Sequence, residues 1–299
     1  MLDMNRDGIA ARLLPLIYFL IVSFPHHYVS YLYDKYVLVP LGMDAVQYYA
    51  DIGSAALLVL VLLFAVRLIV IQKRDSWKHL LLWAATIVLM ILADRYLVVN
   101  NIERIHFPQY AMLAILLMLT LHDSGLVFFV TCFAGFVDEF QQYVTNPNHT
   151  NYLDFNDIVL NILGAALGLF VMLSLFKAKH RETSQFEKSV SQYTLGAAAL
   201  TASMIGLLMI FGRLVPYAHV LRGERHVVGI VDGKLSFILS FQHNESFWTL
   251  ADNGKSFHEM TAGEGIAVVL LLIIVLRFMI RWIESPGPRS VPPMVEMRG

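Results

Sequence analysis

The sequence predicts an all-α polytopic membrane protein with about eight transmembrane helices and a small extracytoplasmic β-hairpin subdomain between the last two. Of its 299 residues, 57% are hydrophobic and only 15% are charged, whereas soluble domains contain about 25% charged residues. A membrane-spanning helix needs about 20 mostly apolar residues. Eight windows approach this requirement, at residues 10–28, 52–71, 79–99, 107–121, 125–143, 157–176, 193–212 and 265–282.

Charge and cysteine content exclude several classes of protein. The formal net charge of −1 gives no sign of a nucleic-acid partner. The single cysteine, Cys132, lies within an apolar window, so the chain can form no intrachain disulfide and no metal–thiolate cluster. The first apolar window lacks a small-residue cleavage site, so we expect no cleaved signal peptide. From these patterns we assign no cofactor and no metal.

Lysine and arginine gather in segments that the eight windows place on one side of the membrane. These segments are "QKRDSWK" at 72–78, "KAKHRETSQFEK" at 177–188 and the carboxy-terminal end. By the positive-inside rule this side is the cytoplasm, so both termini are predicted to be cytoplasmic. The expected order is a first helix with an outer aromatic loop (1–51), a helical core (52–180), a cytoplasmic loop with the seventh helix (181–212), the β-hairpin subdomain (213–264), and the eighth helix with a cytoplasmic tail (265–299).

The predicted outer segment 213–264 contains two strong turn signals. Asp232-Gly233 and Asn253-Gly254 each lie between β-prone runs, and such dipeptides favour two-residue hairpin turns. We therefore expect strands near 227–231 and 235–240, and a second pair flanking Asn253-Gly254. This subdomain has two interpretations: a surface that docks a protein partner through its edges and aromatic side chains, or a cap over the helices.

Polar residues gather at the predicted outer ends of four consecutive helices, where a charge in hydrocarbon is costly. Along the sixth helix Asp157 and Asn161 share one stripe with Gly164 and Gly168, whose GxxxG spacing predicts close helix packing. We predict one shared pocket, with Arg104 and His106 as its nearest counter-charges, and expect Asp94–Arg95 and Glu103–Arg104 to pair locally. The candidate ligand-binding residues are Arg104, His106, Asp138, Glu139, Gln142, Asp157 and Asn161.

Three segments carry a family resemblance. "ERIHFPQY" at 103–110, "DEFQQ" at 138–142 and "DFNDIVLNILGAALG" at 154–168 resemble the VanZ-like family of membrane proteins in order and spacing. The resemblance covers roughly the second to sixth helices and is strongest from Arg104 to Gly168. One position departs from the family, because Asn151 stands where family members often have an arginine. Loss of that arginine puts the binding of an anionic group in doubt, unless His149 or Arg104 replaces it.

The resemblance implies a bacterial inner (cytoplasmic) membrane setting and a teicoplanin-resistance-type role, but no reaction. Three interpretations of the polar residues stay open: a structural network, a site for a lipid-linked or glycan-like envelope molecule, and a catalytic or metal site. Two functions are considered. In the first, the protein binds a membrane lipid or lipid-linked envelope molecule. In the second, it is an accessory or structural subunit of a larger membrane complex, and its partner contacts residues 213–264. Whether the protein is an enzyme is left open.

Overall fold

The computed structural model describes residues 9–72, 76–145, 152–175, 185–217, 227–242, 246–251 and 254–284. Three of the sequence predictions concern residues outside these ranges: the role of Asn151 or His149, the turn at Asn253, and the basic segments after residues 175 and 284. The described residues are mostly helical, with strands confined to the region between residues 214 and 257.

The helices from α1 to α9 come before the strands in the chain, and α10 comes after them. In chain order they are α1 (Ile9–Ser23), α2 (His26–Tyr33), the π-helix η1 (Asp34–Leu38), α3 (Val39–Leu41), α4 (Met43–Gln72), α5 (Ser76–Tyr96), the 3₁₀ helix η2 (Asn101–Ile105), α6 (His106–Leu121), α7 (Ser124–Thr145), α8 (Phe155–Leu175), α9 (Gln185–Ile210) and α10 (Ala262–Glu284). Pro25 separates α1 from α2, as expected for a residue that cannot donate a backbone hydrogen bond.

Five helices in the described part of the chain are long and apolar enough to cross a membrane. They comprise Trp77–Tyr96, Asn101–Leu121, Ser124–Thr145, Phe155–Leu175 and Ala262–Glu284. This is compatible with a multi-pass membrane protein. The other predicted crossings fall on α1, α4 and α9, of which α1 and α9 contain only the shorter apolar stretches Leu13–Ser23 and Leu195–Ile210. A total of eight crossings therefore stays a prediction.

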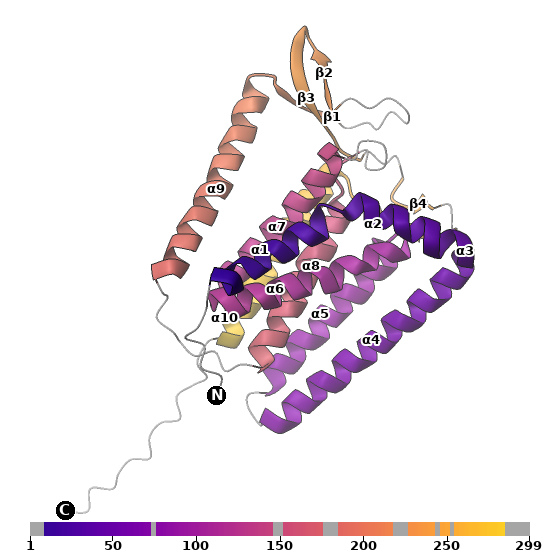
Figure 1. Ribbon diagram of the computed structural model, residues 1–299, viewed down its shortest axis with the longest axis vertical. Helices are drawn as coiled ribbons and strands as arrows, with labels where there is room; N and C mark the ends of the chain where they lie inside the picture. Colours follow the sequence, from indigo (N-terminus) through magenta and orange to yellow (C-terminus); the bar gives the residue numbers. More distant parts are fainter. Residues whose placement is uncertain are drawn as a thin grey trace, which may run out of the picture.

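Helix α8 occupies the centre of the bundle and packs against α5, α6, α7 and α10 (Figure 1). Within its most apolar window, 83% is buried inside the protein. Two glycines let α6 approach α8 closely. A Cβ atom on Gly164 would lie 2.7 Å from the carbonyl oxygen of Phe107, and one on Gly168 would overlap the carbonyl group of Ala111. Small residues permit such backbone-to-backbone contact between membrane helices.

The strands form two separate sheets. β2 (Val228–Val231) pairs antiparallel with β3 (Lys234–Ser240), and the turn residues Asp232 and Gly233 both have positive φ. β4 (Thr249–Leu250) pairs antiparallel with β5 (Ser256–Phe257). The remaining strand, β1 (Leu214–Tyr217), was not predicted, and it pairs in parallel with β3. β1 contains Pro216, and it lies at the edge of its sheet, where a missing backbone donor is tolerated.

The segments that contain the strands pack on one end of the bundle, where α5 and α7 end and α8 and α10 begin. We call this the strand end. The backbone N–H of Leu153 donates to the Ser240 carbonyl at 3.0 Å, and that of His258 donates to the Tyr96 carbonyl at 2.7 Å. The Tyr143 hydroxyl on α7 donates to the Ile238 carbonyl. These contacts place the strands directly above the ends of the helices (Figure 1).

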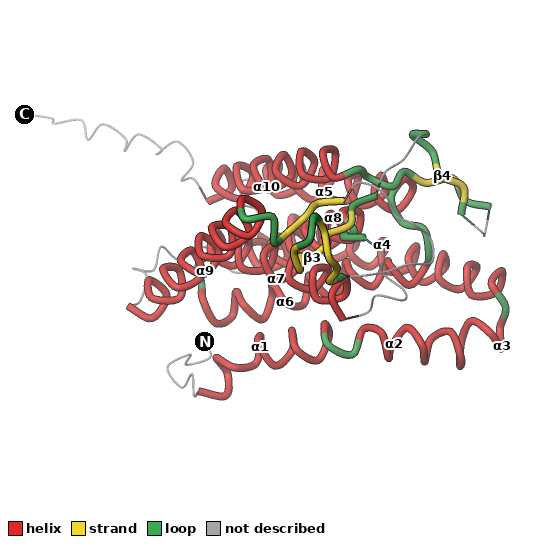
Figure 2. The backbone as a smooth tube through the Cα atoms, turned by 90° about the horizontal axis from the view of Figure 1, so that it is seen from above, coloured by secondary structure: helices red, strands yellow, loops and turns green. Residues whose placement is uncertain are grey.

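Two parts of the chain lie outside the central bundle. The elements α1 to α4, which we call the arm (residues 9–72), begin with α1, α2 and α3 in a row along one side of the molecule, after which α4 turns back (Figures 1 and 2). Helix α9 stands apart from the bundle on another side and joins it through β1 (Figure 1).

Candidate functional site

Polar side chains from α6, α7 and α8 meet inside the bundle. His106, Asp138 and Glu139 are each 1% exposed, and Asn161 is 0% exposed. With Tyr110 they form a group that we call the buried polar cluster. Three consecutive apolar helices thus direct polar atoms toward one another, so that these atoms can form hydrogen bonds with each other.

Asn161 on α8 connects the other two helices. Its Nδ2 donates to Oε1 of Glu139 at 3.2 Å and to the Gly135 carbonyl at 3.4 Å. Its Oδ1 lies 2.8 Å from Nδ1 of His106, so the imidazole N–H donates to the amide oxygen. One side chain therefore bonds to both α6 and α7. Gly135 makes this approach possible, because a Cβ there would lie 2.8 Å from Cβ of Asn161.

His106 lies between two carboxylates. Its Nδ1 is 4.0 Å from Oε1 of Glu139, and its Nε2 is 3.5 Å from Oδ2 of Asp157. The Asp157 side chain is 16% exposed and forms the outer edge of the cluster. Gln142, one turn beyond Glu139, donates from Nε2 to Oε1 of Glu139 at 3.4 Å. Six of the seven predicted ligand-binding residues therefore lie together, with Gln142 and Asp157 at the edge.

Tyr110 belongs to the cluster although sequence reasoning did not single it out. Its hydroxyl donates to Oδ2 of Asp138 at 2.9 Å, and its ring lies 6.5 Å from that of His106 at an interplanar angle of 20°. Tyr110 is four residues after His106, so the two share one face of α6. The four-residue spacing from His106 could therefore have identified Tyr110 as a member of the cluster from the sequence.

The cluster has the donor types of a metal site but uses them in hydrogen bonds. Ligand atoms of His106, Asp138 and Glu139 all lie within 4.8 Å of one another. Imidazole and carboxylate together suit zinc and related transition metals. However, Tyr110 binds Asp138, and Asn161 binds both Glu139 and His106. This arrangement favours a structural network that fixes α6, α7 and α8 relative to one another.

Arg104 lies apart from the buried polar cluster. Its Nε and Nη2 bind the Asp94 carboxylate at 2.5 Å and 3.0 Å, and its Nη1 binds Asp51 on α4 at 2.7 Å. The expected local pairs Asp94–Arg95 and Glu103–Arg104 were therefore wrong. Glu103 instead accepts hydrogen bonds from the backbone N–H groups of Val99 and Asn100, where it caps η2. Arg104 makes a bidentate pair with the carboxylate of Asp94, which lies on α5. Such a pair is stronger than a single hydrogen bond between the same groups.

A groove lies between the arm and helices α5, η2 and α6, and we call it the arm groove. Its volume is about 1140 Å³, above the range of about 300–1,000 Å³ for most ligand pockets. Its walls are predominantly apolar, and its polar lining includes Asp94, Asn101 and Arg104. Representative apolar and aromatic lining residues, from the arm and then from α5 and α6, are Tyr33, Val46, Tyr49, Met90, Phe107 and Met112.

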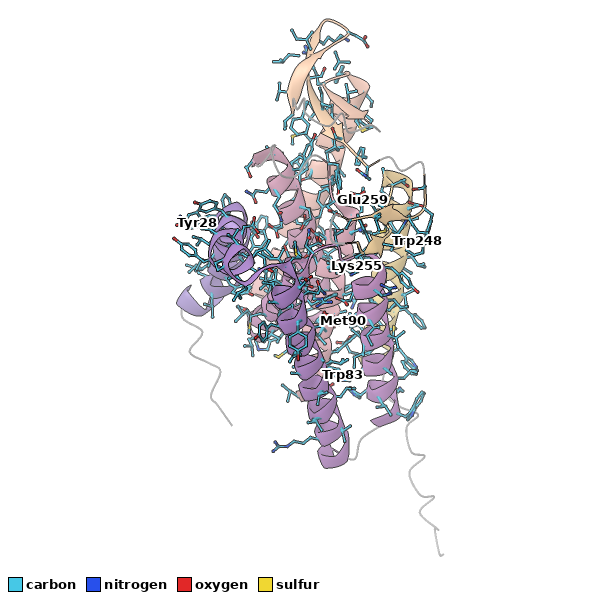
Figure 3. All side chains as sticks on the ribbon, turned by 90° about the vertical axis from the view of Figure 1, so that its right-hand side faces the viewer. Tyr28, Trp83, Met90, Trp248, Lys255 and Glu259 are labelled. Atoms are coloured by element: carbon cyan, nitrogen blue, oxygen red, sulfur yellow. The ribbon has the colours of Figure 1, made fainter. Side chains whose placement is uncertain are left out.

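The groove and the buried polar cluster use different faces of α6. Phe107, Ala111 and Met112 line the groove, whereas His106 and Tyr110 belong to the cluster. Figure 3 shows Trp83 and Met90 along α5, with Lys255 and Glu259 beyond them toward the strand end. The ammonium of Lys255 donates to the carbonyl groups of Asp94 and Val98 at 2.8 Å and 2.7 Å.

A second polar group lies at the strand end, outside the spanning segments. Asp154 accepts hydrogen bonds from the N–H groups of Asn156 and Asp157, at 2.8 Å and 3.4 Å, and thus caps α8. Burial, with the Glu259 carboxylate adding to it, raises the pKa of Asp154 to about 6. Burial lowers the pKa of Lys255, which nearby Asp94 partly opposes.

Comparison with known proteins adds no relative: no protein-family model, curated protein or solved structure matches the chain. The VanZ-like resemblance therefore stays a prediction that rests on the three quoted segments.

Proposed function

We propose that this membrane protein binds an amphipathic envelope molecule, a lipid or lipid-linked glycan, with its hydrocarbon part in the arm groove. One observation carries the proposal: the groove is both unusually large and almost wholly apolar along its walls, with a charged group at Arg104. Small polar ligands are held by several convergent polar groups, whereas a hydrocarbon chain needs a long apolar wall of this kind.

The buried polar cluster supports this function indirectly. Its hydrogen bonds hold α6 against α7 and α8, and the glycines of α8 bring the α6 backbone into direct contact. The opposite face of α6 is then a fixed wall of the groove. We therefore assign the cluster a structural role, with the ligand on the other side of α6.

We further propose that the protein lies in the cytoplasmic membrane of a bacterium with its strand end on the extracytoplasmic side, so that the Arg104 end of the groove is near that surface. A membrane-impermeant maleimide tests the orientation in a Cys132→Ala background. Leu235→Cys, at a position 63% exposed on β3, should be labelled from outside intact cells. Trp77→Cys at the start of α5 should not, and the reverse pattern would overturn the orientation.

Binding is tested by filling the groove. Gly53 lines it, and a Cβ on Gly53 meets nothing within 4 Å, so Gly53→Leu occupies groove space without disturbing packing. Gly196→Leu on α9 is the matched control, because that glycine is equally open and lies outside the groove. Lipid retained through purification, quantified by mass spectrometry, should fall for Gly53→Leu and stay at the wild-type level for Gly196→Leu. Equal retention in both variants would refute the proposal.

A second candidate function is that of an accessory subunit in a larger membrane complex. It is favoured by α9, which stands apart from the bundle and leaves apolar side chains such as Leu195, Leu200 and Met204 exposed. Purification from native membranes without crosslinking separates the two functions. A stoichiometric protein companion would support the subunit role, and a protein that purifies alone with bound lipid would oppose it.

A further inference from the structure

We infer that the arm contains an interfacial helix, which lies flat in the head-group region of the bilayer at the strand end and contacts lipid through its tyrosine side chains. This helix, which we call the tyrosine helix (residues 26–41), comprises α2, η1 and α3 in unbroken succession. The inference goes beyond the proposed function, because it concerns the outer surface of the arm and is independent of what the groove binds.

The two ends of the tyrosine helix are held near the strand end of the bundle. Before it, the Tyr18 hydroxyl on α1 donates to the carbonyl of Gln109 on α6 at 3.1 Å. After it, Asp51 on α4 binds Arg104 of η2 at 2.7 Å. Gln109 and Arg104 both belong to the half of the spanning stretch Asn101–Leu121 that is nearer the strand end. The tyrosine helix therefore joins two points close to one face of the membrane.

The tyrosine helix lacks the length and the composition of a membrane crossing. As a helix, residues 26–41 extend over about 24 Å, whereas the hydrocarbon core is about 30 Å thick. Among the described residues, the stretches that are long and apolar enough to cross a membrane do not include it. Asp34 and Lys35 lie near its middle and are exposed, and charges at the bilayer centre are costly. Figure 1 shows α2 at a steep angle to α4.

The tyrosine helix has a groove side and an outer side. A stripe at four-residue spacing lines the arm groove: Val29, Tyr33, Val37 and Leu41. On the other faces, four aromatic or apolar side chains are each at least half exposed: Tyr28, Tyr31, Tyr36 and Val39. Figure 3 shows Tyr28 at the outer edge of the arm. These side chains therefore face the surroundings of the protein.

The outer side chains do not suit water or the bilayer core. In water, exposed tyrosine rings beside Val39 would form an apolar patch of a kind that is rare on monomeric soluble proteins. In the core, the tyrosine hydroxyls and the charges of Asp34 and Lys35 would lose their hydrogen bonds to water. The head-group region accommodates the rings and the polar groups together, which explains why tyrosine gathers there in membrane proteins.

Aromatic rings rather than net charge would hold the tyrosine helix at the interface. Besides His26 and His27 at its start, its ionisable side chains other than tyrosine are Asp34 and Lys35, whose charges balance. The Lys35 ammonium lies 5.6 Å and 5.2 Å from the ring centres of Tyr31 and Tyr36, so the cation stays among the rings. The partner is therefore the interfacial layer of a bilayer, whether its lipids are zwitterionic or anionic.

The test uses the full-length protein in phosphatidylcholine vesicles, with single spin labels in a Cys132→Ala background. Tyr28→Cys and Val39→Cys are about 16 Å apart along the helix. Label accessibility to oxygen and to a water-soluble nickel chelate gives the depth of each position. We expect both labels at nearly the same depth, about 5–10 Å into the boundary between head groups and acyl chains. Replacing part of the phosphatidylcholine by phosphatidylglycerol should leave both depths unchanged.

Two control labels calibrate the depth scale. Val88→Cys on α5 is at a position 54% exposed near the middle of the spanning stretch Trp77–Tyr96, so it should report the bilayer centre. Leu235→Cys on β3, at a position 63% exposed, should report water.

Four outcomes would overturn the inference. A depth difference of about 16 Å between Tyr28→Cys and Val39→Cys would mean that the helix crosses the membrane. Labels as accessible to the chelate as Leu235→Cys would place the helix in water, and labels as deep as Val88→Cys would place it in the core. Labels shielded from both reagents in the purified protein would show that a second copy of the chain covers this surface.

Discussion

The two faces of α6 differ sharply in what they contact. One face packs against α7 and α8 through backbone contacts at Gly164 and Gly168 and through the buried polar cluster. The other face borders a groove of about 1140 Å³ whose far wall is the arm. A single helix thus contributes to a closely packed helix interface and to a large cavity.

This difference shows where polar residues in an apolar chain are used. The carboxylates of the packed face are enclosed and hydrogen-bonded, so their contribution is to fix helix positions. On the groove side, the charges of Asp51 on α4 and Asp94 on α5 are partly exposed. We therefore expect substitutions on the packed face to change stability, and substitutions on the open face to change binding.

The largest effect on stability is expected from Asn161→Leu. This change removes the amide that bonds to His106, Glu139 and the Gly135 carbonyl. Each buried polar group whose hydrogen bond is not replaced costs about 1–3 kcal/mol. Thermal unfolding followed through the thiol reactivity of Cys132, the single cysteine of the chain, should show a clear loss of stability.

Gln192→Leu is the control for this experiment, because Gln192 is exposed on α9. It should leave the unfolding temperature close to that of the wild type. If Asn161→Leu is as stable as this control but loses bound lipid, the cluster is a ligand site, and its assignment to structure is wrong.

A smaller effect is expected from Gly168→Ala. A Cβ there would overlap the Ala111 carbonyl of α6, so the two helices must move apart, and overpacking of this kind costs about 1–3 kcal/mol. Gly196→Ala in open space on α9 should instead be neutral or slightly stabilising. The comparison is made by unfolding temperature in one detergent. Equal responses of the two glycines would mean that α6 and α8 are not in close contact.

The smallest effect concerns pH at the strand end. Burial raises the pKa of Asp154 from 3.8 to about 6, so the folded protein holds this proton more tightly than the unfolded chain. The resulting stabilisation is fully present below the unfolded pKa and is lost as pH rises through about 6. Asp154→Asn keeps an oxygen that can cap α8 and removes this titration. Its unfolding temperature should fall less than that of the wild type between about pH 4 and 6, and parallel curves would contradict the assignment.

The convergence of α6, α7 and α8 could be predicted from the sequence because each polar residue falls near the same end of a predicted helix. His106, Asp138 and Asn161 needed only helix periodicity and alternating helix direction. The GxxxG spacing likewise marked a close contact for α8. These features depend on local sequence and on the order of the helices.

The arm groove could not be predicted in this way. Its shape depends on how the arm crosses the bundle, and no residue pattern in α1 to α4 specifies that path. The pairing of Arg104 with Asp51, 53 residues away, depends on the same path. Sequence reasoning instead paired charges that were adjacent in the chain. The parallel strand β1 was missed for a related reason. Its partner is β3, and β2 lies between these two strands in the sequence.

A density map of the wild-type protein, purified in its native membrane lipid, tests the central claim most directly. We expect an elongated density in the arm groove, along Phe107 and Met112 of α6, with its polar end near Arg104. A map in which the arm closes onto α6 and fills that space with protein side chains would contradict the account.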